Sequence, residues 1–245
     1  MTEILGVRVD SIAPPELENR LRSFLQSDRL HKVFTPNAEM LLAARQNPGF
    51  QECLNRGDLN LPDGVSLIFA DRFLNTKRSQ SKLFRATGVD TLGLICRLAA
   101  EEGKRVMLYG ADPGVAEKAA ESIQKSYPHL VIKGLDPGVI KNEEANVGPI
   151  NEFEPDVLAV ALGHGKQEHF ICSMEGKVPS LKIAIGVGGA LDYLSGNVPR
   201  APRLMQQRGL EWLFRLIQQP KRIGRIFNAV VVFPFIVIQA RIKAL

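Results

Sequence analysis

The 245-residue chain is 45% hydrophobic and 23% charged, a composition that excludes a disordered or low-complexity protein and suits one large α/β domain, alone or with an appendage. Its net charge of +5 is unevenly distributed, because residues 197–245 hold nine basic residues and a single acidic one, Glu211. That region carries +8 and leaves −3 for the rest of the chain. We expect the basic region to meet an anionic partner such as phosphate, lipid head groups or nucleic acid; a solvated basic helix is the alternative.

Short extended segments alternate with helix-like segments along most of the chain. The hydrophobic patterning predicts strands in residues 4–9, 32–35, 105–110, 130–135, 156–163 and 182–188. It predicts helices in residues 14–27, 37–56, 64–75, 88–102, 113–126, 142–152, 166–175 and 203–218. This alternation indicates an α/β fold of the Rossmann-like kind, a largely parallel sheet with helices on both faces. We expect a catalytic domain over residues 1–195 and a helical C-terminal appendage over residues 196–245.

The junctions between strands and helices are the places to look for a ligand site, because open α/β sheets bind ligands beyond the carboxyl ends of their strands. Thr35 and Asn37 follow the strand at 32–35, and Asn37 can cap the next helix, which would also explain it as turn chemistry alone. In "LPDGVSLIFA", Asp63 stands alone between a short apolar segment and an apolar helix. Gly110 ends a strand before Pro113, where free backbone amides could meet a phosphate.

Two glycine-containing loops follow later strands. In "ALGHGKQEHF", Gly163 and Gly165 flank His164, and Gln167 and Glu168 lie at the start of the next helix. In "IGVGGALDYLSG", glycines 186, 188 and 189 allow a close approach of backbone to ligand, and the carboxylate at position 192 could accept hydrogen bonds from ribose hydroxyls. Both loops are candidates for nucleotide binding.

Several other chemistries lack their sequence signatures. The glycine runs match neither G-x-G-x-x-G in a first βαβ unit nor the P-loop, and no G-x-S-x-G elbow or Asp-x-Asp pair is present. His164 and His169 have the wrong spacing for one helical face, and the three cysteines (Cys53, Cys96 and Cys172) form no C-x-x-C pair. We therefore expect no metal site, no cofactor and no disulfide framework. The start of the chain lacks a long apolar stretch, which argues against a signal peptide and favours the cytoplasm.

Taken in order, seven segments carry a family resemblance. They are "TPNAEMLLAARQNP", "LPDGVSLIFA", "RATGVD", "LYGADPGVAEKAA", "PDVLAVALGHGKQE", "IGVGGALDYLSGNVPRAP" and "GLEWLFRLIQQPKRIGR". Together they resemble the WecG/TagA/CpsF family of bacterial glycosyltransferases over about residues 35–225. The chain departs from the common family pattern at His164–Gly165 and Ala190–Leu191, in the predicted donor loops.

The resemblance implies an inverting, metal-independent transferase that moves an N-acetylmannosamine-type sugar from a UDP donor to a polyprenyl-diphosphate-linked GlcNAc at the inner membrane face. It implies that Asp63 is the catalytic base, although this residue could also only cap the following helix. The implied substrate-binding residues are Thr35, Asn37, Arg85, Gln167, Arg215, Arg222 and Arg225. The implied nucleotide-binding residues are Gly110, Gly163, Glu168, Gly188, Gly189 and Asp192.

The C-terminal region supports the same interpretation. Its helix at 203–218 has an apolar side followed by basic residues, and "IFNAVVVFPFIVIQA" is apolar for about a dozen residues and contains Pro234. This apolar segment is predicted to be too short to span a membrane and to lie in the interface of an anionic membrane, in a peripheral protein. In solution we expect it to be covered, by the body or by a second subunit of a homo-oligomer, or to be disordered. Two other functions remain open: a non-catalytic nucleotide-binding scaffold, and a nucleic-acid-binding protein, which the scarcity of aromatic residues among the basic ones disfavours.

Overall fold

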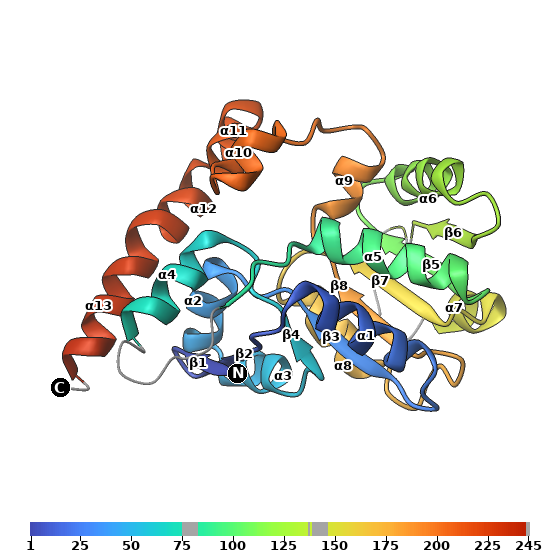
Figure 1. Cartoon of the computed structure of the whole chain (residues 1–245), viewed down its shortest axis with the longest axis horizontal. Coiled ribbons are helices and arrows are strands. Elements are labelled where there is room, and N and C mark those ends of the chain that lie inside the picture. Colours follow the sequence, from blue (N-terminus) through green and yellow to red (C-terminus); the bar gives the residue numbers. More distant parts are fainter. Residues whose placement is uncertain (75–82, 137, 139–146, 244–245) are drawn as a thin grey trace.

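The computed structural model describes residues 1–74, 83–136, 138 and 147–243 and contains a six-stranded sheet flanked by helices (Figure 1). Its strands are β3 (His31–Phe34), β4 (Leu59–Asn60), β5 (Arg105–Gly110), β6 (Val131–Leu135), β7 (Val157–Ala161) and β8 (Ile183–Gly186). Their order across the sheet is β4-β3-β8-β7-β5-β6, and every pair of neighbours is parallel. The predicted fold class is therefore confirmed, and the carboxyl ends of all six strands lie at one edge of the sheet.

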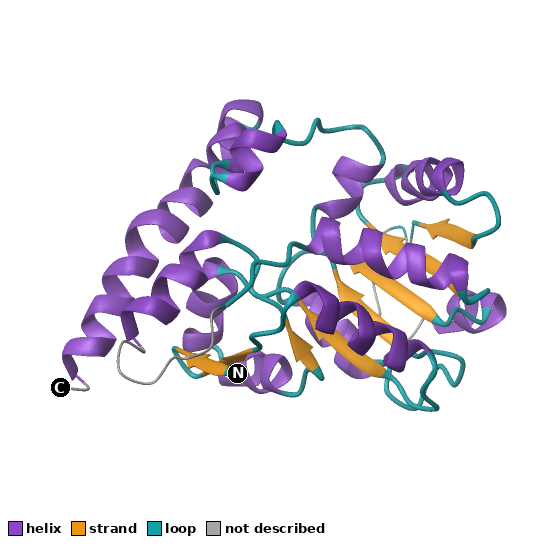
Figure 2. Cartoon of the chain, in the orientation of Figure 1, coloured by secondary structure: helices purple, strands orange, loops and turns teal. Residues whose placement is uncertain are grey.

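Each face of the sheet is covered by its own group of helices (Figure 2). One hydrophobic core receives α1 (Pro14–Leu25), α5 (Gly88–Glu101), α6 (Val115–Ser126) and α9 (Ala190–Leu194). The other receives α2 (Ala38–Gln46), α3 (Pro48–Asn55), α4 (Val65–Leu74), α7 (Val147–Phe153) and α8 (Lys166–Ser173). Alternate strand residues belong to opposite cores: Val106 and Leu108 to the first, Met107 and Tyr109 to the second. A strand buried on both faces cannot show a polar side, which is why these segments are apolar throughout.

Several predicted boundaries change for local reasons. The extended segment at 4–9 belongs to an antiparallel hairpin, β1 (Thr2–Ile4) and β2 (Val7–Val9), which is separate from the main sheet and turns at the left-handed residues Leu5 and Gly6. The helix predicted over 37–56 is divided into α2 and α3, because Asn47, which precedes Pro48, is extended and caps the second helix. Residues 142–146 of another predicted helix, and residue 75 of a third, lie outside the described residues.

The expectation that the cysteines form no disulfide is wrong for one pair. Cys53 of α3 and Cys172 of α8 are bonded, with their Cα atoms 6.5 Å apart across 119 residues of sequence. The two helices pack against each other, so residues that are distant in the chain become neighbours. Spacing along a sequence cannot reveal such a pair, because it depends on helix packing.

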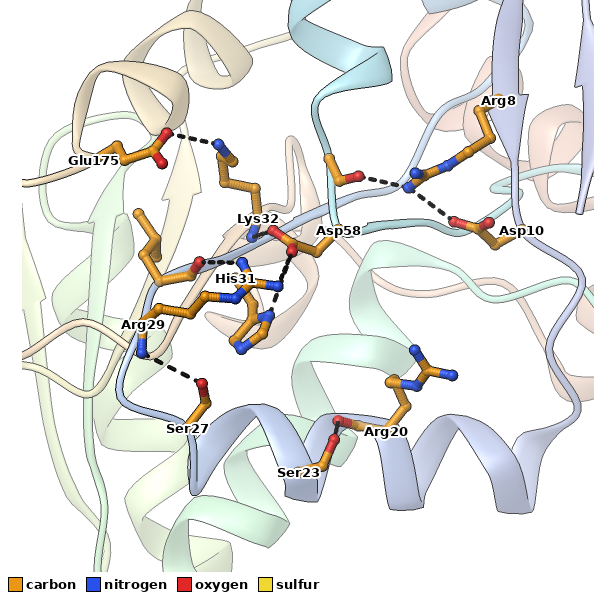
Figure 3. A network of polar contacts seen from close by, with 12 residues as sticks. Arg8, Asp10, Arg20, Ser23, Ser27, Arg29, His31, Lys32, Asp58 and Glu175 are labelled. Atoms are coloured by element: carbon orange, nitrogen blue, oxygen red, sulfur yellow. Dashed lines mark hydrogen bonds and ion pairs between the residues drawn. The ribbon is translucent and has the colours of Figure 1, made fainter.

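A polar network lies at the amino ends of β3 and β4, away from the strand ends where a ligand is expected (Figure 3). Asp58, just before β4, accepts a hydrogen bond of 2.9 Å from the backbone of Lys32 and forms an ion pair of 2.7 Å with Arg29. His31 is buried there, stacked on the ring of Phe24 with their centroids 3.9 Å apart. Burial and the charge of Arg29 lower the pKa of His31, although Asp58 opposes them. Because this network lies at the opposite end of the strands from the expected ligand site, we assign it a structural role.

The C-terminal region is mostly helical between residues 203 and 243. The helix predicted over 203–218 is divided at the left-handed Gly209 into α10 (Arg203–Gln207) and α11 (Glu211–Gln218). A continuous helical run follows, made of η2 (Pro220–Arg222), α12 (Ile223–Phe227), the π-helical turn η3 (Asn228–Val232) and α13 (Phe233–Lys243). Pro234 does not interrupt this run; it lies just after the wider π-type turn, where a missing hydrogen bond is tolerated.

This helical run corrects the prediction that the apolar C-terminal segment is short. Pro220–Ile242 is one helix of 23 residues, and an 18-residue stretch of it has a mean hydropathy of 1.8, so it is long and apolar enough by length and composition to cross a membrane. One side of it nevertheless packs on the body: Phe233 and Val237 are fully buried in the core that contains α2 and α4. Phe235 and Ile238 remain 59% and 40% exposed. The segment is therefore helical, with two side chains buried against the body and most of its length uncovered, whereas we expected it to be covered or disordered.

Candidate functional site

A cavity of about 1320 Å³ lies at the carboxyl ends of the strands, between the body and the C-terminal helices. Most of the site residues predicted from the sequence line it, although they come from six separate segments. Those that line it are Thr35, Asn37, Asp63, Arg85, Gly163, Gln167, Gly188, Gly189, Asp192, Arg215, Arg222 and Arg225. Gly110 and Glu168 are not among its lining residues. The tertiary structure thus brings both glycine loops, the lone carboxylate and the arginines of the C-terminal region to one place.

Backbone hydrogen bonds hold Asp63 beside the loop that follows β3. The amide of Asp63 donates to the carbonyl of Pro36 at 2.9 Å, and the amide of Ala86 donates to the carbonyl of Pro62 at 3.1 Å. The first of these bonds continues the parallel pairing of β3 with β4 past the ends of both strands, and the second joins the same segment to the residues before α5. Asn37 is held in the same loop, where its side-chain oxygen caps α2 by accepting from the amide of Met40 at 3.1 Å, as the sequence predicted.

The side chain of Asp63 is a weaker acid than an ordinary aspartate. Burial raises the pKa of Asp63 to about 6, although the charges of Arg85 and Arg215 and a hydrogen bond from the backbone of Gly88 oppose this shift. Gly88 is the first residue of α5, so the helix start that this carboxylate contacts belongs to α5. A carboxylate with a pKa near 6 accepts a proton more readily than an exposed aspartate and is still largely ionised at neutral pH.

The second glycine loop lies between the end of β3 and Arg215. The hydroxyl of Thr35 donates to the carbonyl of Gly186 at 3.1 Å, which fixes the end of β8 beside the end of β3. Gly188 has a positive φ of 51°, and the backbone at Gly189 lies against the guanidinium of Arg215, where a Cβ atom would collide. Burial raises the pKa of Asp192 in the same loop, and the charge of Arg215 opposes it.

Gly110 and Glu168, which were predicted to bind the nucleotide, pack against other parts of the body and do not line the cavity. Gly110 also has a positive φ, 103°, and its Cα faces the carbonyl of Ala161 closely enough to exclude a side chain. It therefore permits close packing of β5 and β7. Glu168 is fully buried behind the cavity, where it accepts hydrogen bonds from the Gly165 backbone and from the side chain of Gln167.

Three arginines of the C-terminal region form the opposite wall. The guanidinium of Arg215 lies over the ring of Tyr193, 5.0 Å from its centroid, and its buried Nε has no hydrogen-bond partner among the described residues. Burial and the charges of Arg215 and Arg225 lower the pKa of Arg222. Because these cations repel one another at short range, the cluster is suited to bind an anion with more than one charge.

Comparison with known proteins agrees with this geometry. The model of the "Glycosyl transferase WecG/TagA/CpsF family" matches residues 2–245. The chain belongs to this family. It is therefore a glycosyltransferase, and the resemblance found in seven separate segments extends over nearly its whole length.

Three curated relatives of this glycosyltransferase carry the name N-acetylglucosaminyldiphosphoundecaprenol N-acetyl-beta-D-mannosaminyltransferase. The relative from Bacillus subtilis (strain 168) is 32% identical over 87% of this chain and 85% of its own length. The relative from Bacillus spizizenii (strain ATCC 23059 / NRRL B-14472 / W23) is 31% identical over 90% and 84%. A third, from Staphylococcus aureus (strain MRSA252), is 27% identical over 98% and 93%.

The site of this glycosyltransferase contains residues that the sequence reasoning missed. Glu211 forms a close ion pair with Arg85, whose guanidinium also donates to the carbonyl of Gln206 at 3.0 Å. Arg200 forms a two-bond contact with Asp90, at 2.7 and 2.9 Å. Glu211 was visible as the single acidic residue in a basic region, a signal that points to a specific partner. The other pairs depend on how the C-terminal region folds back, which no local pattern shows.

The chemistry available to the glycosyltransferase follows from these groups. Among the residues that the structure describes, no group of three or more His, Cys, Asp or Glu is placed to hold a metal ion. The cavity offers two aspartates with raised pKa values, Asp63 and Asp192, together with amides of two glycine loops and several guanidinium groups. Such a set can remove a proton from a hydroxyl group and stabilise a departing anion.

Proposed function

We propose that the chain transfers an N-acetylmannosamine-type sugar from a UDP donor to a polyprenyl-diphosphate-linked GlcNAc, with inversion at the anomeric carbon and without a metal ion. The names of the curated relatives support the transferred sugar and the lipid-linked acceptor. The observation that carries the proposal for this chain is that Asp63, whose pKa is raised to about 6, lines one cavity together with Arg215, Arg222 and Arg225. This arrangement matches the two requirements of a displacement at a sugar carbon.

Asp63 acts as the base in this proposal. It takes the proton of the attacking acceptor hydroxyl while that oxygen forms a bond to the anomeric carbon of the donor. The bond between the anomeric carbon and the phosphate oxygen breaks in the same step, and UDP leaves with the electron pair. One displacement inverts the configuration, so an α-linked donor gives a β-linked product. Thr35 and Asn37 flank the base and would orient the hydroxyl groups of the reacting sugars.

The arginine cluster stabilises the charge that develops on the departing diphosphate. Arg215 is close enough to affect the pKa values of both Asp63 and Asp192, so it lies between the base and the donor loop. Arg222 and Arg225 stand beside it on the next helical turns. Fixed cations in a partly buried cavity can stabilise the negative charge of the leaving diphosphate, as a divalent metal ion does in other transferases. The glycine loops at 163–165 and 186–189 would hold the nucleotide, with the carboxylate of Asp192 on the ribose.

The C-terminal region, residues 196–245, is an appendage that joins the membrane surface to the site. Its basic residues and its row of exposed apolar side chains suit an anionic membrane, where each basic group near the surface adds about 1 kcal/mol. Leu213, Ile217, Phe227, Phe235 and Ile242 are exposed along it. The protein would then work as a peripheral enzyme on the cytoplasmic face, where its lipid-linked acceptor is held.

A donor panel tests the proposal directly. Several UDP-sugars are incubated with a short-chain lipid-diphosphate-GlcNAc, with and without EDTA, and the anomeric configuration of the product is read by NMR. We expect transfer from UDP-N-acetylmannosamine or its uronic acid, a β-linked product and no loss of rate in EDTA. Binding of UDP without turnover on any donor would instead support a non-catalytic scaffold. An EDTA-sensitive rate would contradict metal independence alone.

A further inference from the structure

Glu168 is the most deeply buried carboxylate close to the cavity, yet it does not line it. It is 0% exposed, and it sits at the third position of α8. One of its oxygens, Oε2, accepts a hydrogen bond of 2.6 Å from the backbone of Gly165. The other, Oε1, accepts one of 2.7 Å from Nε2 of Gln167. Both neighbours are donors, so the carboxylate is used as an acceptor on each of its oxygens.

Gln167 extends this chain of hydrogen bonds into the second donor loop. It is 3% exposed, and its Oε1 accepts from the backbone amide of Gly188 at 3.0 Å. Its amide is therefore fixed in one orientation: the nitrogen must face Glu168 and the oxygen must face Gly188. The strand end leading to Gly188 passes directly over the pair, since a Cβ at Gly186 would lie 2.9 Å from Nε2 of Gln167 and 3.2 Å from Oε1 of Glu168.

A simpler role for Glu168 is to cap α8. Its hydrogen bond from the Gly165 amide is one of the two bonds of a capping box, which stabilises the start of any helix. That role explains the contact with Gly165 but leaves the contact with Gln167, and through it the placement of Gly188, without a purpose. The two explanations differ in what they predict for Gly188, which Glu168 does not touch.

We propose that Glu168 is a positioning residue: by orienting the amide of Gln167 it fixes the backbone of Gly188, and so couples the loop after β7 to the loop after β8. Both loops line the cavity. The part of this proposal that concerns donor affinity rests on the proposed function, since these loops are the expected nucleotide-binding loops. The coupling of the loops itself does not depend on any ligand.

Replacing Glu168 with glutamine separates the two roles. In E168Q the new side chain keeps one acceptor oxygen, which can retain the bond to Gly165, and gains an NH2 group that faces Gln167. Gln167 must then turn its oxygen toward the new donor and its nitrogen toward the Gly188 amide. The NH2 group of Gln167 and the amide of Gly188, which are both donors, then face each other. The hydrogen bond between Gly188 and Gln167 is therefore lost. A cap alone would leave Gly188 unaffected.

The measurement is amide hydrogen exchange at Gly165 and Gly188 by NMR on the full chain without ligand. We expect exchange at Gly188 to rise at least tenfold in E168Q while Gly165 changes little, and E168D, which is too short to reach both partners, also to release Gly188. S173A is the matched control, because Ser173 lies in the same helix and its hydroxyl donates to the carbonyl of Phe170; this variant should leave Gly188 protected. Unchanged exchange at Gly188 in folded E168Q and E168D would overturn the proposal.

Titration with UDP forms the second arm of the experiment. The affinity of E168Q for UDP should fall at least tenfold relative to S173A. If the wild-type chain does not bind UDP, the proposed function fails, and the exchange result still decides whether the loops are coupled. If the wild type binds UDP and E168Q binds it equally well despite a released Gly188, the positioning role toward the donor is wrong.

Discussion

Glu39 and Arg225 are 186 residues apart in the chain and form a three-bond ion pair across the mouth of the cavity. The shortest contact, Nη2 to Oε2, is 2.7 Å, and His164 lies 3.5 Å from the same nitrogen. Glu39 belongs to α2 of the body and Arg225 to α12 of the C-terminal region. The pair between Arg85 and Glu211 joins the same two parts with the charges reversed. Opposite charges on both sides therefore hold the C-terminal region over the site.

The first prediction concerns this ion pair. E39Q should loosen α12 and misplace Arg225, so limited proteolysis of the C-terminal region should become several-fold faster and kcat/KM for transfer should fall about tenfold. The protease rate should also rise with salt in the wild type, because the pair is partly exposed and screened. E52Q is the control, since Glu52 forms an exposed pair with Arg56 within one helix. Equal rates of proteolysis of E39Q and E52Q would contradict the role of the Glu39–Arg225 pair in holding the C-terminal region.

The second prediction concerns the base. D63N keeps the shape of the side chain and removes its ability to accept a proton, so kcat should fall at least a hundredfold while UDP binding is retained. The variant should not be destabilised. Burial raises the pKa of Asp63 to about 6, so its charged form weakens the folded state above that pH, and D63N should be more stable at pH 8 by about 1–3 kcal/mol. Near-normal turnover would remove Asp63 from the mechanism.

The third prediction is the acidic limb of the pH profile. Asp63 must be ionised to take a proton, so kcat/KM should fall tenfold per pH unit below about 6 and level off above it. R215A removes a charge that holds this pKa down, so the limb should move to higher pH. R97A is the matched control, because Arg97 pairs with Glu18 and Glu101 away from the cavity. A limb that stays in place in R215A would show that Arg215 does not act on the base.

The fourth prediction concerns stability and His31. Burial, the largest cause, and the charge of Arg29 lower the pKa of this side chain, so the folded state favours neutral His31. Its contribution to stability is present above the ordinary pKa of about 6.5 and is lost as the pH falls below it. H31F retains the stacking on Phe24 and cannot be protonated, so its Tm should fall less than that of the wild type between pH 7.5 and 5.5. Thermal unfolding at both pH values measures this difference. Parallel losses in the two proteins would exclude His31 as the cause.

The fifth prediction concerns the membrane. F235S/I238S changes two exposed apolar side chains of α13 and leaves the buried Phe233 and Val237 in place, so Tm should be unchanged while binding to anionic liposomes falls at least tenfold. V131S, on the edge strand β6, is an equally exposed control at another surface and should bind as the wild type does. Sedimentation with liposomes checks the result. Unaltered binding of the double variant would place the membrane contact elsewhere.

Much of the fold could be predicted from the sequence because it depends on local patterning. Five of the six predicted strands correspond to strands of the main sheet, and the sixth, at 4–9, is a separate hairpin. The apolar runs at 105–110 and 156–163 indicated strands buried on both faces. What failed was decided by single residues or by distant contacts. Asn47 and Gly209 divide helices that the periodicity predicted as continuous. The bond between Cys53 and Cys172 depends on the packing of α3 against α8.

For the site, the sequence by itself determined which groups are present: a lone carboxylate after a short strand, two glycine loops and a basic C-terminal region. The seven segments that contain these groups, taken in order, resembled the family. Only the tertiary structure decided their relationships. It placed Arg215 near Asp63, paired Glu39 with Arg225, and buried Glu168 behind the cavity, where it accepts a hydrogen bond from Gln167. The physical reason is that burial, charge coupling and hydrogen-bond partners depend on distances between segments, and a sequence records only distances along the chain.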